Sequence, residues 1–148
     1  MRIDSYYGPV TDAFAAEVAS LAGRDPASIP AIDIARALRS NLVACLWYEN
    51  GVKKLEAIAA MQCIENLTGE KWGRISEIYA SPSVSPEQVR ALVEFLSNVG
   101  ARWGVRHITV DCFTHDYGVD QAGLQLLCEM TLMQTRQAET LRTTVPAT

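Results

Sequence analysis

The chain has 148 residues, of which 49% are hydrophobic, and this is enough apolar material for one continuous core. Its formal net charge is −4 and Lys and Arg form no cluster, which argues against a nucleic-acid groove. The first residues lack the apolar run of a secretory signal, and the longest run elsewhere, Leu42 to Tyr48, is too short to span a bilayer. We therefore expect a single domain over residues 1–148 in a cytoplasmic protein, or an intracellular or virion protein if it is viral, with no nucleic-acid or membrane partner.

One strand and two helices are predicted in the N-terminal part. Arg2 to Tyr6 is predicted to be a strand. Thr11 to Ala22 places its apolar residues on one helical face, and Gly23 then supplies a C-terminal stop. Pro30 suits the first turn of a second, short helix.

Three strands in an antiparallel meander are expected next. Leu42 to Tyr48 and Leu55 to Asn66 flank Glu49-Asn-Gly51, whose Asn-Gly pair tolerates the positive φ angles of a tight hairpin turn. A second turn at Thr68-Gly69-Glu70 leads into the third strand, Lys71 to Tyr79.

A helix and a further strand follow the meander. Ser85-Pro-Glu-Gln88 has the form of a capping box with proline in the first turn, and the apolar stripe of the helix continues to Gly100. His107 to Phe113 is rich in Ile, Val and aromatic residues, which predicts a strand. These lengths favour a right-handed crossover that pairs this strand in parallel with the one ending at Tyr79.

The C-terminal part allows two interpretations. Gln121 to Glu129 is predicted to be a helix, and Thr131 to Val145 one or two strands. The alternative is one longer helix, because four apolar residues also fit helical spacing: Leu124, Leu127, Cys128 and Leu132.

The order of these elements and one local motif resemble a known family. Glu77-Ile-Tyr79-Ala-Ser-Pro82 resembles the Glu-x-Tyr-Val-x-Pro that ends the fourth strand in the GNAT superfamily, whose members move an acetyl group from acetyl-CoA to an amine. The predicted order matches the GNAT arrangement over nearly the whole chain. The resemblance implies an α/β (α+β) fold with a mixed, twisted, mainly antiparallel sheet and helices on both faces.

In the family, the pantetheine arm of CoA lies in a gap where the fourth and fifth strands splay apart, bonded mainly to backbone groups of the fourth strand. The resemblance carries these contacts to Ile78 and Ala80. The family's Arg/Gln-x-x-Gly-x-Gly/Ala pyrophosphate loop falls on residues 85–90. The cofactor contacts implied there are Ser85, Gln88, Val89 and Arg90.

This loop departs from the family's pattern. Pro86 has no amide hydrogen, Glu87 adds negative charge, and Gln88 and Arg90 stand where the family keeps glycine. At about 5 Å from a phosphate, one carboxylate costs on the order of 1 kcal/mol in water and several at a partly shielded site. The segment from Ser85 to Gln88 is also simply a good helix start that needs no ligand. We therefore expect acetyl-CoA to bind weakly or not at all.

Two residues are candidates for proton transfer. Glu77 matches the strand position of a frequent family base; the alternatives are a partner for Arg74 or a carboxylate on the open face of the sheet. The family's catalytic Tyr falls on Leu127, which cannot donate a proton. Tyr117, in the loop before it, is a substitute acid or an ordinary surface tyrosine.

No metal site is expected. The four cysteines, which we expect to be reduced core residues, lie far apart and form no C-x-x-C pair. His107 and Asp111 share one face of a strand but sit about 13 Å apart, too far to share one ion.

Two functions stay open. One is a GNAT-like protein with impaired or lost acetyl-CoA use that serves as a binding or assembly module, for instance an accessory subunit or a viral-particle component, with itself or another protein as partner. The alternative is an active acyl-CoA-dependent N-acetyltransferase that acts on an amine of a small molecule or protein. Its acceptor site would be built from the first two helices and the last hairpin. A module has no reason to keep the gap between the fourth and fifth strands open, so we expect that gap to be filled from within or by a partner segment.

Overall fold

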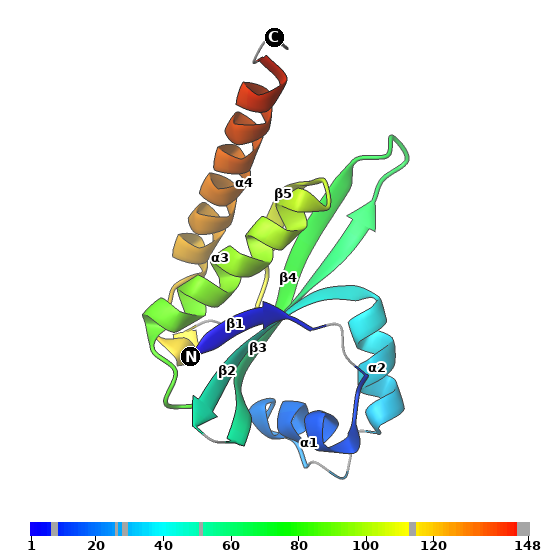
Figure 1. The fold of residues 1–148 in the computed structure, drawn as a ribbon, viewed down its shortest axis with the longest axis vertical. Coiled ribbons are helices and arrows are strands. Elements are labelled where there is room, and N and C mark those ends of the chain that lie inside the picture. The colour runs from blue at the N-terminus through cyan, green and yellow to red at the C-terminus, as the bar shows by residue number, and fades with distance from the viewer. Residues whose placement is uncertain (7–8, 26, 28–29, 51, 113–114, 145–148) are drawn as a thin grey trace.

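The computed structural model describes residues 1–6, 9–25, 27, 30–50, 52–112 and 115–144. The elements, in chain order, are β1 (Arg2–Ser5), α1 (Asp12–Leu21), α2 (Ala31–Arg39), β2 (Asn41–Asn50), β3 (Val52–Glu65), β4 (Lys71–Ala80), α3 (Pro86–Arg102), β5 (Val105–Val110), the 3-10 turn η2 (His115–Tyr117) and α4 (Gln121–Thr144). The strands form one sheet in the order β1-β2-β3-β4-β5 (Figure 1). Every neighbouring pair is antiparallel except β4 and β5, so the predicted mixed sheet is confirmed.

Helices cover the sheet on both faces, as expected. On one face, α1 places Phe14 against Val43, Cys45 and Trp47 of β2. On the other, α3 and α4 pack on a larger core to which β2 contributes Ala44. Because both faces of β2 are buried, its sequence is a continuous apolar run and does not alternate.

The predicted parallel pairing of β4 with β5 is confirmed. Lys71 lies opposite Val105 at one end of the register and Ile75 opposite Val110 at the other. β4 then continues to Ala80 along β3, whereas β5 ends at Val110. The two strands therefore part at the carboxyl end of β4.

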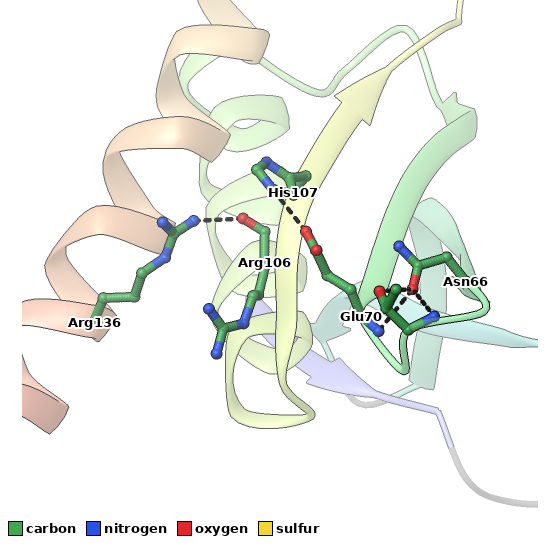
Figure 2. A network of polar contacts seen from close by, with 6 residues as sticks. Asn66, Glu70, Arg106, His107 and Arg136 are labelled. Carbon is green, nitrogen blue, oxygen red and sulfur yellow. Dashed lines mark hydrogen bonds and ion pairs between the residues drawn. The ribbon is translucent and has the colours of Figure 1, made fainter.

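Local signals at turns and helix ends agree with the structure at several points. Gly23 and Gly69 have φ of 72° and 82°, the left-handed region that glycine adopts without strain. At the β3–β4 turn, the Asn66 side chain accepts hydrogen bonds from the Thr68 amide (3.0 Å) and the Glu70 amide (2.9 Å), as Figure 2 shows. The predicted turn at Asn-Gly51 lies at the edge of the described residues, because Gly51 is outside them.

The end of α3 differs from the prediction. The helix continues through Gly100 to Arg102, and Gly104, with φ of 87°, follows its end. Gly100 serves packing instead, since a β-carbon there would lie 2.5 Å from Cε of the buried Met61.

The prediction of strands over Thr131 to Val145 is wrong: residues 121–144 form one helix, which was the alternative, and Val145 lies outside the described residues. Threonine favours strands, but here the Thr131, Thr135 and Thr140 hydroxyls each donate to the carbonyl four residues earlier, at 2.8, 3.0 and 2.9 Å. These bonds satisfy the hydroxyls inside a helix. The apolar spacing of the alternative then decides the structure, because Leu124, Cys128 and Leu132 are buried on one side of α4.

α4 lies along the free edge of β5 and bonds its backbone through side chains. Gln121 Nε2 donates to the Val110 carbonyl at 2.7 Å. Gln125 accepts from the Val110 amide at 2.8 Å and donates to the Ile108 carbonyl at 2.7 Å. Further along, Arg136 donates to the carbonyl of Arg106 (Figure 2). A helix therefore takes the hydrogen-bonding place that a last strand would have had. None of the described helices combines the length and the hydropathy that crossing a membrane requires.

Candidate functional site

Tyr117 lies at the point where β4 and β5 part. Its hydroxyl donates a hydrogen bond to the Ile78 carbonyl at 2.8 Å. Burial raises the pKa of this phenol, as do the nearby Asp116 and Cys112, while a hydrogen bond with the Ala80 backbone lowers it. The net effect is a raised pKa, so at neutral pH the hydroxyl keeps its proton and acts as a donor. Tyr117 thus contacts both backbone positions, 78 and 80, that the family resemblance assigns to pantetheine.

The connection that carries Tyr117 packs against the start of α3. Gly118 has φ of 70°, and a β-carbon there would lie 2.9 Å from Cγ of Pro86. Only a residue without a side chain fits so close to the proline ring in this conformation. The glycine therefore lets the chain after β5 approach the segment that the resemblance identifies as the pyrophosphate loop.

The predicted capping box at the start of α3 is present. The Ser85 amide donates to Gln88 Oε1 at 2.8 Å, and the Gln88 amide donates to Ser85 Oγ at 3.2 Å. Arg90 turns back toward the first turn, with its guanidinium 3.7 Å from Glu87 Oε1. Val89 is fully buried in the core beneath the helix. Ser85, Gln88 and Arg90 thus make contacts within the helix start itself.

Glu77 lies on the face of β4 that α1 and α2 cover, opposite the face on which α3 packs. It lines a cavity of about 230 Å³ between α1, α2 and the sheet, together with Tyr79 and Arg24. The Tyr79 hydroxyl donates to Glu77 Oε1 at 3.1 Å. Burial raises the pKa of Tyr79, and the charge of Glu77 and this hydrogen bond raise it further. The suggested pairing of Glu77 with Arg74 is wrong, because Arg74 bonds Asp111 at 2.5 Å.

The structure also shows a polar cluster that the sequence interpretation missed. Glu56 on β3 is only 6% exposed, and its carboxylate accepts from the hydroxyls of Ser81 and, at 3.1 Å, Ser83. The Ser81 amide donates to the Glu56 carbonyl at 2.8 Å. These bonds fix the segment between β4 and α3. A charged residue inside the apolar stretch Leu55-Glu-Ala57 was the available signal, since such a residue needs partners when buried.

The two strand residues considered for a metal have separate polar partners instead. His107 Nε2 lies 3.0 Å from Glu70 Oε1, as Figure 2 shows, and its ring packs against Trp72. Asp111 pairs with Arg74. Within the described residues, no group of three or more potential ligands could hold a metal ion.

Leu127, Cys45 and Cys128 lie in or against the core. Leu127 is half-buried against the core beneath α3. Cys45 and Cys128 are buried as expected, whereas Cys63 is exposed, so the prediction that all four belong to the core is wrong.

The strand order, the parallel β4–β5 unit around α3 and the parting of the two strands define a GNAT fold. No protein-family model and no curated protein sequence matches the chain. Several solved structures, in contrast, are similar to it in fold. A putative acetyltransferase from Agrobacterium tumefaciens superposes with a TM-score of 0.63 at 14% identity, covering 86% of this chain and 91% of its own.

Two further structures are similar to a comparable extent. An acetyltransferase from Trypanosoma brucei has a TM-score of 0.62 at 14% identity, covering 74% of this chain and 81% of its own. Glucosamine-6-phosphate N-acetyltransferase from Arabidopsis thaliana has a TM-score of 0.60 at 14% identity, covering 78% and 86%. At such identities the likeness shows the fold alone.

Proposed function

We propose that this GNAT-fold chain is a protein-binding or assembly module with impaired or lost use of acetyl-CoA. The observation that carries the proposal is the 2.8 Å hydrogen bond from the Tyr117 hydroxyl to the Ile78 carbonyl. The family resemblance assigns that carbonyl to the pantetheine arm. A side chain of the protein therefore takes a backbone group that the cofactor would need.

The start of α3 supports the same proposal. Pro86 offers no amide hydrogen, and the amides of Ser85 and Gln88 already have partners in the capping box. Arg90 lies within ion-pair distance of Glu87, but both side chains are exposed, so this pair compensates little of the repulsion that Glu87 exerts on a phosphate. A pyrophosphate would have to displace existing bonds and approach a carboxylate.

Calorimetric titration with acetyl-CoA tests the proposal. We expect no binding at micromolar ligand for the unchanged protein. Tyr117→Phe removes the bond to Ile78 and keeps the ring, whereas Tyr117→Ala removes both. A typical hydrogen bond contributes about 1 kcal/mol, so freeing the carbonyl should strengthen binding by about fivefold. Tyr48→Phe, at an exposed tyrosine on β2, is the matched control. A micromolar or tighter dissociation constant for the unchanged protein would overturn the proposal.

One observation favours the alternative, an active N-acetyltransferase. Glu77 lines the 230 Å³ cavity between α1, α2 and the sheet, which is the region where the resemblance implies the amine acceptor. In that reaction Glu77 would take the proton of the attacking ammonium. Turnover of acetyl-CoA with a panel of amines, lost in Glu77→Gln at unchanged acetyl-CoA affinity, would establish this function in place of the first.

A further inference from the structure

The side of α4 that faces away from the sheet is uncharged and largely apolar. Leu126, Met130, Met133 and Leu141 are 57%, 45%, 53% and 68% exposed. Their spacing places them, with Gln137, on one face of the helix. We call Leu126, Met130, Met133, Gln137 and Leu141 the α4 stripe.

This pattern is unusual for a surface helix. The opposite side of α4 already packs on the core through Leu124, Cys128 and Leu132. A helix with one buried face normally carries charged residues on the other, and contiguous exposed apolar side chains mark interaction surfaces. The α4 stripe runs over about 22 Å of helix, and the C-terminal turns of α4 project beyond α3 in Figure 1.

We infer that the α4 stripe binds a second copy of this chain, with the two helices antiparallel about a two-fold axis next to Met133. The inference rests on the proposed assembly role and names its partner. The argument for a second copy is charge complementarity. Glu129 and Arg136 are both exposed and border the same side of the stripe, one on each side of Met133 along the helix.

In the antiparallel arrangement, Glu129 of each copy lies opposite Arg136 of the other, so two ion pairs form by symmetry. The apolar positions match in the same register, since Leu126 faces Leu141 of the second copy. A parallel two-fold pair would instead place this side of one helix against the opposite side of the other, where Glu129 and Arg136 would meet no opposite charge. The charges therefore select the antiparallel pair.

The shape of the surface beside the α4 stripe agrees with the antiparallel register. A shallow cavity of about 450 Å³ lies beside the C-terminal half of the stripe, lined by Met133, Arg136, Gln137, Thr140 and Leu141. The antiparallel pair brings Leu126 and Met130 of the second copy over it. A membrane surface fits less well, because interfacial helices carry many Lys and Arg beside the apolar face, whereas α4 has two arginines, Arg136 and Arg142, balanced by Glu129 and Glu139.

Sedimentation velocity over a micromolar concentration series tests the inference. One helix pair gives an interface at or below about 1,200 Å², so we expect a reversible dimer with a micromolar dissociation constant. Met133→Glu sets two like charges face to face and should weaken the dimer by at least about tenfold. Leu67→Glu makes the same kind of change at a fully exposed residue of the β3–β4 turn and should leave the dimer unchanged.

A charge exchange tests the register. Glu129→Arg alone and Arg136→Glu alone should each be monomeric, because each places like charges together twice. An equimolar mixture of the two variants should form a heterodimer, since both contacts are then attractive. Arg136 also bonds the Arg106 carbonyl, and Glu129 accepts from Gln125 at 3.2 Å, so the melting temperature of each variant is compared first. If Arg136→Glu fails to fold, Met133→Glu and Glu129→Arg still decide the question.

Each outcome has one meaning. A chain that stays monomeric at high micromolar concentration, or a dimer that Met133→Glu does not weaken, overturns the inference. Monomers that bind anionic vesicles assign the α4 stripe to a lipid surface and overturn it as well. Acetyl-CoA titration of the same samples separates the proposals. A monomer that ignores acetyl-CoA refutes the second copy alone, whereas a dimer that turns acetyl-CoA over refutes the lost cofactor use alone.

Discussion

Replacement of Gln125 by leucine measures how much α4 stabilises the edge of β5. The Gln125 side chain makes two bonds to this strand, from the Val110 amide at 2.8 Å and to the Ile108 carbonyl at 2.7 Å. Each bond contributes about 0.5–1.5 kcal/mol, and a buried backbone group left without a partner costs more. Because the site is half-buried, water replaces part of the loss. We expect Gln125→Leu to lower the free energy of unfolding by about 2 kcal/mol.

Urea denaturation followed by circular dichroism gives this free energy, and the melting temperature should fall by about 4–8 °C. Leucine has a helix propensity close to that of glutamine, so α4 itself is not weakened. Gln121→Ala, which removes one bond to the Val110 carbonyl, should cost about half as much. An unchanged or higher stability of Gln125→Leu would refute the idea that these side chains satisfy the strand edge.

Three further changes have defined outcomes. Gly100→Ala places a β-carbon 2.5 Å from Met61 Cε, so this side chain must move, and the gain in helix propensity offsets part of the strain; urea denaturation should show a net cost of up to about 1 kcal/mol that becomes smaller when the same change is made in a Met61→Ala background, and equal effects in both backgrounds would contradict this packing. Burial raises the pKa of Cys45 from 9.0 to about 12. The unfolded chain therefore loses this proton first, and stability should fall as pH rises from 9.0 toward about 12, with a smaller fall in Cys45→Ala at matched pH. Glu56→Leu removes the carboxylate that accepts from both Ser81 and Ser83 and should speed proteolysis between β4 and α3, whereas Glu56→Gln should keep most of the protection; equal rates for both would argue against the cluster.

The sequence predicted elements whose signals are local. The two partners of the capping box, Ser85 and Gln88, lie within four residues of each other, so the sequence alone identifies them. The strand–helix–strand spacing favours a right-handed crossover. The parallel pairing of β4 with β5 followed from these two facts. The turn at Gly69 was also predictable, because a tight turn needs a residue with positive φ whatever the surrounding fold.

The missed features depend on contacts between distant segments. Thr131 and Thr135 favour a strand by composition, and their bonds to carbonyls in the preceding turn exist only once the helix has formed. That helix buries Leu124, Cys128 and Leu132, whose helical spacing the sequence showed, but the contact of Gln125 with the edge of β5 could not be predicted from the local pattern. Tyr117 is likewise an ordinary loop tyrosine by sequence, and its bond to Ile78, 39 residues earlier, requires the folded sheet.

The two proposals meet in the segment after β5. A last strand beside β5 would satisfy that edge with its own backbone and would leave no helical face turned outward. A helix at the same edge satisfies it with side chains such as Gln125, and its outer side then remains for contacts such as Met133. The connection into that helix brings Tyr117 onto the Ile78 carbonyl. A helix at this edge, in place of a strand, would therefore account for both the proposed loss of cofactor use and the outward stripe. Because the two lie on different parts of the segment, Tyr117 variants should alter acetyl-CoA binding without changing self-association, and Met133→Glu should do the reverse.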